Sequence, residues 1–248
     1  MKQIYAMLPS AVTLGNLTCG FLSIVSASAG NFKGAAWLIF LSMVFDIMDG
    51  RVARLTKTTS RFGEELDSLA DLVSFGAAPA FLFYGFFLKA EFGRVGLVLS
   101  CIFVLCGALR LARFNVTEGS DNFQGLPIPG GAALLASTVI HGHVFQPWAG
   151  TRIFPVILAL SAVLMISNFE YPAFKKKGAQ GNIYKKLLLA LILLGVILIV
   201  HEILILAVSF FYAFLGPLGW MWEVTMRTWA VGVVEEKIRN RRLKKSMD

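Results

Sequence analysis

Charged residues are scarce in this chain of 248 residues, and their scarcity excludes an ordinary soluble domain. They make up 15% of the sequence, whereas apolar residues make up 56%, and the mean hydropathy is +0.70. Cysteine and histidine are also rare, at three residues each. The cysteines have no metal-binding spacing and indicate no disulfide framework. A composition of this kind is typical of an integral membrane protein.

Long apolar runs account for most of the chain. A helix needs about 20 mostly apolar residues to span a bilayer, and this length predicts about eight transmembrane helices in an all-α membrane protein. A seven-helix count, with a re-entrant or tilted final piece, is the alternative, because His201 and Glu202 are the only turn signal in the last apolar run. The helices are expected near residues 11–29, 34–56, 66–88, 95–114, 127–146, 153–170, 187–201 and 203–219.

The distribution of basic residues predicts how these helices are oriented. The loops after the first, third and fifth helices hold few lysines and arginines, and the others fall on or face the opposite side. The few are Lys33, Lys89, Arg94 and Arg152. The positive-inside rule makes the opposite side cytoplasmic. We therefore expect a multi-pass protein of the cell (inner) membrane with both termini in the cytoplasm.

The end of the chain differs from the rest in composition. We expect a transmembrane domain over residues 1–222 and a polybasic cytoplasmic tail over residues 223–248. Such a tail attracts anionic lipid by about 1 kcal/mol per basic residue near the surface. It carries no nucleic-acid-binding motif and no interleaved aromatic residues, so membrane lipid is the expected partner and nucleic acid is not.

Four aspartates lie in the apolar helices, where an ionised carboxylate is costly unless something neutralises it. Asp46 and Asp49 are three apart and share a helix face, and Asp67 and Asp71 are four apart and share another. The polar segment between the pairs lets the second helix of the pair run back antiparallel to the first. The four carboxylates would then meet at the cytoplasmic side. All-oxygen ligation suits Mg²⁺, Mn²⁺ or Ca²⁺ better than zinc.

These aspartates belong to a longer pattern, Asp46-x2-Asp49-Gly50-x2-Ala53-Arg54-x8-Gly63-x3-Asp67-x3-Asp71. With all eight specified positions present, the chain resembles the CDP-alcohol phosphotransferase family over most of its length. The resemblance implies that the four aspartates hold two divalent cations, Mg²⁺ or Mn²⁺, and that Asp71 is also the general base. It further implies a cradle for the cytidine and phosphates formed by Gly50, Ala53, Arg54 and Gly63. Close helix packing is the alternative explanation for the small residues.

Four further segments resemble the phosphatidylserine synthase branch of this family. They are Thr13 to Leu17, Ala108 to Asn115, Gly125 to Pro129 and Tyr171 to Lys175. The resemblance implies transfer of a phosphatidyl group from CDP-diacylglycerol to L-serine with release of CMP, in a homodimer. It places Asn16 among the ligand-binding residues. Arg110 and Arg113, three apart, would hold the serine carboxylate or a phosphate, with snorkelling to lipid phosphates as the alternative.

Two other functions remain compatible with the sequence. The nearer one keeps the chemistry but uses glycerol phosphate or inositol phosphate as acceptor, or an archaeal-type lipid as donor. The other is a transporter or channel that uses the aspartates as a cation path. The clustering of the acids at one membrane face and the lack of a visible inverted repeat argue against transport.

Overall fold

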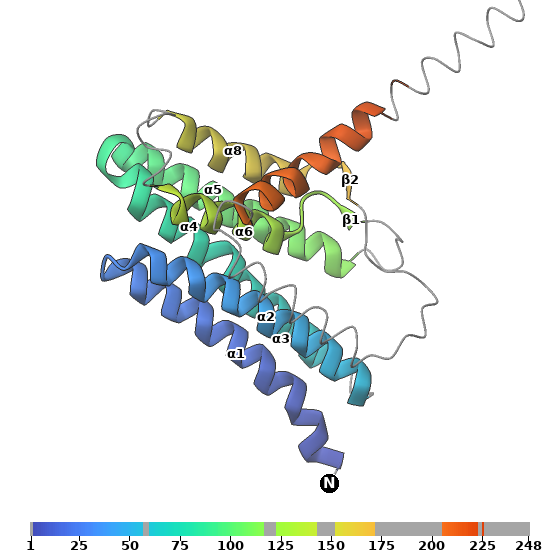
Figure 1. The fold of residues 1–248 in the computed structure, drawn as a ribbon. Coiled ribbons are helices and arrows are strands. Elements are labelled where there is room, and N and C mark those ends of the chain that lie inside the picture. Colours follow the sequence, from blue (N-terminus) through green and yellow to red (C-terminus); the bar gives the residue numbers. More distant parts are fainter. Residues whose placement is uncertain are drawn as a thin grey trace, which may run out of the picture.

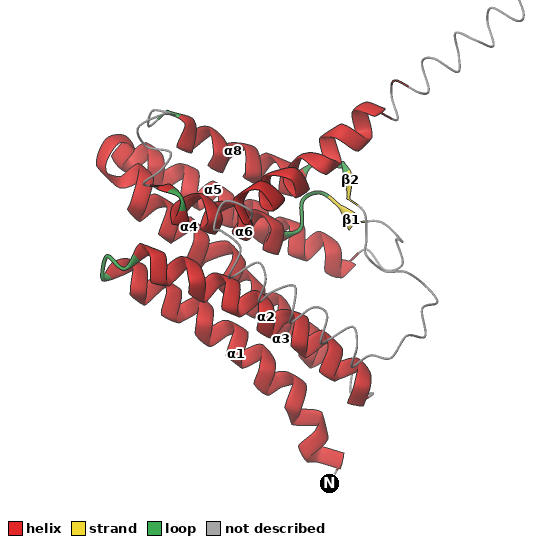
Figure 2. Ribbon diagram, in the orientation of Figure 1, coloured by secondary structure: helices red, strands yellow, loops and turns green. Residues whose placement is uncertain are grey.

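The computed structural model describes residues 2–56, 60–116, 123–142, 152–171, 205–222 and 225. These residues are helical apart from turns and one pair of two-residue strands (Figure 2). Helices α1 (Lys2–Ser28) and α2 (Phe32–Thr56) form an antiparallel hairpin. The turn between them contains Gly30 at φ 83°, a conformation that a Cβ disfavours.

The second aspartate pair lies on the helix that follows. Helix α3 (Arg61–Asp71) is capped by Ser60, whose side-chain oxygen accepts a hydrogen bond from the Gly63 amide at 3.1 Å. The helix continues through a π-helical stretch (Leu72–Ala77), α4 (Ala78–Phe83) and a second π-helical stretch (Tyr84–Leu88). The first π-helical stretch directly follows Asp71, and such turns occur frequently at functional sites.

The chain reverses direction again at Gly93, before the last described helices. Gly93 interrupts helix α5 (Lys89–Val116) with φ 43° and ψ −115°, so the remainder of α5 packs back along both π-helical stretches. The later elements are β1 (Phe123–Gln124), α6 (Ile128–Ile140), α8 (Ile153–Ile166), β2 (Glu170–Tyr171) and the helix Ile205–Trp222. Strands β1 and β2 pair antiparallel.

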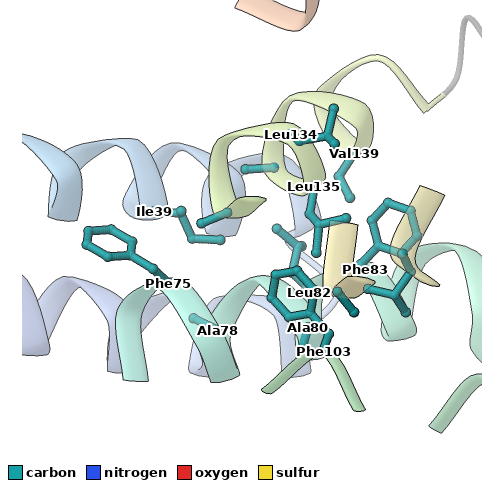
Figure 3. Close-up of a cluster of buried hydrophobic side chains, with 14 of the residues drawn as sticks. Ile39, Phe75, Ala78, Ala80, Leu82, Phe83, Phe103, Leu134, Leu135 and Val139 are labelled. Atoms are coloured by element: carbon teal, nitrogen blue, oxygen red, sulfur yellow. The ribbon is translucent and has the colours of Figure 1, made fainter. Parts of the chain in front are cut away.

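The hydrophobic core lies where α2, α4, α5, α6 and α8 meet (Figure 1). The close-up in Figure 3 shows side chains from α2, α4, α5 and α6 converging, among them Ile39, Phe83, Phe103 and Leu135, each fully buried. Large apolar side chains also cover the outward faces of the helices, as expected for surfaces that meet lipid.

Helix α1 packs through small and polar residues instead of large apolar ones. Its buried stripe contains Thr13, Asn16, Ser23 and Ala27, spaced at helical intervals. Gly20 lies on the same stripe, and a Cβ there would overlap Ser74 in the first π-helical stretch. Small residues of this kind let membrane helices approach closely, which compensates for the weak hydrophobic drive between helices in lipid. The stripe brings α1 against the aspartate-bearing helix.

The prediction of a helical membrane protein is confirmed by the length and the apolar composition of the described helices. Among the described residues, three helical stretches are apolar and long enough to cross a bilayer, namely Pro9–Ser28, Arg61–Val116 and Ile205–Trp222. The longest of them contains the reversal at Gly93 and covers the two helices predicted at 66–88 and 95–114. The total of eight spans stays a prediction, because the helix expected at 187–201 lies outside the described residues.

Several helix ends differ from the predicted ones. Helix α1 is already helical at Lys2 instead of residue 11. Helix α3 starts at Arg61 instead of residue 66, because Ser60 supplies an N-cap that apolar patterning does not register. The helix predicted to reach residue 170 ends at Ile166, because Ser167 is extended with ψ 162°.

Candidate active site

Three of the four predicted carboxylates come together between two neighbouring helices. Asp46 and Asp49 of α2 and Asp67 of α3 each offer an oxygen atom, and these atoms all lie within 4.8 Å of one another. The site is shielded from solvent, since Asp49 is only 5% exposed and the other two are partly buried. The structure therefore brings together three of the four carboxylates that the spacing predicted to meet.

The trio fits an oxygen-binding divalent cation. In the described part of the chain, Asp49 Oδ2 and Asp67 Oδ1 are buried without a hydrogen-bond partner. Buried carboxylate oxygens are rarely left unpaired in native proteins unless an ion or water binds them. No nitrogen or sulfur ligand belongs to the trio, and this donor set suits Mg²⁺ or Mn²⁺.

Asp71 lies one helical turn beyond Asp67 and has a different environment. It is 9% exposed, and its Oδ1 accepts a hydrogen bond of 3.1 Å from the side-chain amide of Asn16. It is outside the close trio but within electrostatic range of all three members. The structure thus brings the fourth carboxylate near the others and gives it a protein donor of its own.

Asn16 links α1 to the helix that carries Asp71. Its side chain is fully buried, and its backbone carbonyl accepts a hydrogen bond of 3.0 Å from Ser74 Oγ. Ser74 belongs to the π-helical stretch that follows Asp71. Two hydrogen bonds therefore hold Asn16 against the helix that carries Asp71. The sequence singled out Asn16 but gave no indication of Ser74.

The nucleotide cradle stays a prediction, and the surroundings of its two glycines can be described. A Cβ at Gly50 would meet no atom within 4 Å, so the described helix packing does not require a glycine there. A Cβ at Gly63 would lie 3.3 Å from the Ser60 cap oxygen. The structure describes Ala53 and Arg54 only through their backbone, which lies in the last turns of α2.

The two arginines of α5 have different surroundings, although the sequence predicted that they converge. Arg110 is 7% exposed and lies within electrostatic range of Asp71. Arg113 donates hydrogen bonds of 3.2 Å to Asn168 Oδ1, 3.0 Å to the Gln124 carbonyl and 3.1 Å to the Ser167 carbonyl. Arg110 faces the site, and Arg113 holds the connections around β1 and the end of α8.

Two further contacts at the end of α5 were not evident from the sequence. Asn115 donates a hydrogen bond of 2.9 Å to Ser68, which lies between the aspartates of α3. Tyr212, in the helix Ile205–Trp222, lies within electrostatic range of Arg110, and a Cβ at Gly130 would come within 2.9 Å of its ring. That helix passes α6 on its way toward β2 (Figure 1).

The segment from Gly125 to Pro129 forms a fixed crossover. Gly125 has φ 78°, and a Cβ there would overlap the Met165 carbonyl. Its amide donates to the Phe169 carbonyl at 2.8 Å, and the Leu126 amide donates to the Leu164 carbonyl at 2.9 Å. The motif thus fixes the path of the chain between α5 and α6.

Comparison with known proteins identifies the family of this chain. The family model described as CDP-alcohol phosphatidyltransferase matches residues 6–233. A Helicobacter pylori (strain 26695) protein named CDP-diacylglycerol–serine O-phosphatidyltransferase is 42% identical over 198 residues, which cover 78% of this chain and 82% of that protein. A Bacillus subtilis protein of the same name is 35% identical over 70% of this chain and 94% of its own length.

A third relative carries another name. The archaetidylserine synthase of Methanothermobacter thermautotrophicus is 39% identical over 71% of this chain and 74% of its own length. The described helices are apolar, and the carboxylate trio between them is suited to a divalent cation. With the family match across most of its length, the chain belongs to the CDP-alcohol phosphatidyltransferase family. Enzymes of this family generally depend on a divalent cation.

Proposed function

We propose that this protein transfers the phosphatidyl group of CDP-diacylglycerol to L-serine, giving phosphatidylserine and CMP. The observation that carries the proposal is the carboxylate trio of Asp46, Asp49 and Asp67 with Asp71 beside it. The names of the bacterial relatives support serine as the acceptor. None of the three relatives described above is named as a transporter, so the cation-path alternative has no support from them.

The four carboxylates would hold two divalent cations, Mg²⁺ or Mn²⁺, with Asp71 shared between metal binding and proton transfer. When bound there, such cations supply neutralisation of the pyrophosphate charge and stabilisation of the leaving phosphate. The open space beside Gly50 supports backbone approach by the nucleotide. Ala53, Arg54 and Gly63 complete the proposed cradle.

Asp71 acts as the general base in this proposal. It takes the proton from the serine hydroxyl as the oxygen attacks the lipid-side phosphorus, and the bond from that phosphorus to the CMP oxygen breaks. Asn16 holds one oxygen of Asp71 by its 3.1 Å hydrogen bond and so fixes the direction of the other. Such positioning supplies a large part of the acceleration in phosphoryl transfer. We assign binding of the acceptor to Arg110, and its burial within electrostatic range of Asp71 supports this role.

A different donor lipid is the second candidate function. The archaetidylserine synthase relative supports it, because that name indicates the same acceptor with an archaeal lipid. Purified protein supplied with L-serine and either CDP-diacylglycerol or its ether-linked archaeal counterpart separates the two. We expect faster release of CMP with the ester-linked donor. Preference for the ether-linked donor would assign the second function, and preference for glycerol 3-phosphate or inositol phosphate over serine would change the acceptor.

We further propose that the site opens to the cytoplasm, in a multi-pass protein of the inner membrane with both termini on that side. The distribution of basic residues supports this orientation. The division into a membrane domain over 1–222 and a basic tail over 223–248 rests on the same argument, and the tail lies almost wholly outside the described residues. A homodimer is proposed by family resemblance. Serine incorporation by sealed inside-out vesicles, but not by right-side-out ones, is the expected result.

A further inference from the structure

Ser74 uses its hydroxyl differently from most buried serines of the described helices. The others donate to a carbonyl three or four residues earlier in their own helix, as Ser42, Ser100, Ser137, Ser161 and Ser209 do. The Ser74 hydroxyl donates instead to the Asn16 carbonyl of α1, at 3.0 Å. A serine can satisfy its hydroxyl within its own helix, so burial alone does not require a bond to a second helix.

The Asn16 carbonyl does not require this bond either. Within α1 it is the acceptor for the amide four residues later, that of Gly20. A carbonyl oxygen has two lone pairs, and the Ser74 hydroxyl uses the second one. Loss of the hydroxyl would therefore leave no backbone group unpaired. We expect it to change how α1 is placed, with little effect on folding.

Gly20 allows the two helices to come this close. Asn16 and Gly20 are four apart and share a face of α1, and Asp71 and Ser74 are three apart on the facing chain. A Cβ at Gly20 would lie 2.6 Å from Ser74 Cα and would also overlap the Ser74 side chain. No rotamer change relieves an overlap with backbone, so α1 would have to move away. Asn16 would then leave Ser74 and Asp71 together.

We infer that Ser74 and Gly20 are positioning residues, which fix the depth and rotation of α1 so that the Asn16 amide reaches Asp71. This inference rests on the proposed function, in which Asp71 is the general base, and deepens it. The bond from Asn16 to Asp71 is 3.1 Å long, near the upper end of the range for N–H···O bonds, so a small displacement of α1 breaks it. Ser74 and Gly20 act through Asn16 and bind no substrate themselves.

Steady-state kinetics test the inference first. Purified full-length protein in detergent, with CDP-diacylglycerol and L-serine, gives kcat and the KM for both substrates. Ser74→Ala should lower kcat about tenfold. Gly20→Ala should lower it about a hundredfold, because misplacement of a group by about 1 Å costs on that order. Both KM values should stay within about twofold, since neither residue is assigned to substrate binding.

A double-mutant cycle separates positioning from a structural role. Asn16→Ala removes the side chain through which Ser74 acts and should itself lower kcat. Ser74→Ala made in that background should then lower kcat by less than about twofold further. A residue that only supports folding would lower kcat by the same factor in both backgrounds. Effects that multiply would therefore overturn the inference.

Ser23→Ala is the matched control. Ser23 is fully buried like Ser74 and also donates to a carbonyl of another helix, that of Ala35 at 2.8 Å, but it lies seven residues beyond Asn16. Its replacement should leave kcat unchanged. Melting temperatures identify variants that do not fold. If Gly20→Ala is among them, the Ser74 cycle decides alone, and Ser74→Cys, a weak donor of similar size, can replace Ser74→Ala.

Two other outcomes overturn the inference and leave the proposed function intact. One is an equal fall in kcat for Ser23→Ala and Ser74→Ala, which would show a general loss of helix packing. The other is a change in the serine KM with kcat unaltered, which would assign the contact to substrate binding. Failure of the unmodified protein to form phosphatidylserine would instead reject the proposed function.

Discussion

At the scale of single residues, Asp71 differs from Asp49 and Asp67. Asp71 has a protein hydrogen-bond donor in Asn16, whereas Asp49 and Asp67 each keep a buried oxygen without a partner in the described chain. A carboxylate held by one oxygen is well placed to accept a proton at the other. Carboxylates with unpaired oxygens are suited to metal binding. The division supports separate contributions to one reaction.

Replacement of any one of the four aspartates by asparagine should abolish turnover without unfolding the protein. Loss of a positioned general base alone costs about 10²–10⁴-fold, so Asp71→Asn should fall at least that far. CMP release by each purified variant, with its melting temperature, checks this. Glu65→Gln is the matched control, because Glu65 is an exposed acid on the same helix as Asp67 and Asp71. Near-normal turnover by Asp67→Asn or Asp71→Asn would contradict the assignment.

Chelation should remove activity and a divalent cation should restore it. The carboxylate trio offers only oxygen ligands, so Mg²⁺ or Mn²⁺ is expected to restore CMP release after treatment with EDTA. The rate is measured while each cation is titrated back, with Asp49→Asn as a variant that should not recover. Full activity after exhaustive chelation would remove cations from the proposed mechanism.

At the scale of elements, Arg113 connects the end of α5 by hydrogen bonds to the chain around β1 and the end of α8. Arg113→Ala removes three hydrogen bonds and should lower the free energy of unfolding by about 1.5–3 kcal/mol, the range for a bond to a charged group. Thermal unfolding in detergent measures it, with the exposed Arg61→Ala as control. A normal melting temperature with a tenfold higher serine KM would instead return Arg113 to the acceptor site predicted from the sequence.

The crossover at Gly125 should tolerate no side chain. Alanine at φ 78° is strained by about 1–2 kcal/mol, and its Cβ would also overlap the Met165 carbonyl. We expect Gly125→Ala to lower stability by at least about 2 kcal/mol. Gly219→Ala is the matched control, because a Cβ at Gly219 meets nothing within 4 Å. Equal melting temperatures for the two variants would show that the crossover is not rigid.

At the scale of the whole molecule, the spacing of residues along the sequence predicted those parts of the site that depend on a single helix face. The pairs Asp46/Asp49 and Asp67/Asp71 followed from helical periodicity, and the polar segment between them predicted the antiparallel return. The partner of Asp71 did not follow, because Asn16 is 55 positions away and its direction depends on how the small-residue stripe of α1 rotates that helix against α3.

For Arg110 and Arg113, spacing along the helix did not predict the surroundings of the two side chains. Residues three apart on a helix point in similar directions, and the sequence therefore predicted that Arg110 and Arg113 bind one group. At the end of a helix, however, the neighbouring connecting segments determine which partners each arginine side chain finds. The chain around β1 and the end of α8 supplies oxygen atoms to Arg113, while Arg110 is turned into the bundle beside Asp71 and Tyr212. No sequence pattern encodes these long-range partners.

The central claim is that the Asp46, Asp49, Asp67 and Asp71 site moves a phosphatidyl group onto serine. Simultaneous measurement of CMP and radiolabelled phosphatidylserine, from purified protein with CDP-diacylglycerol and labelled L-serine, tests it most directly. We predict that the two products form in equal amounts, that neither forms without serine beyond slow hydrolysis, and that Asp71→Asn forms neither. CMP release without labelled lipid, or equal lipid formation by Asp71→Asn, would contradict the claim.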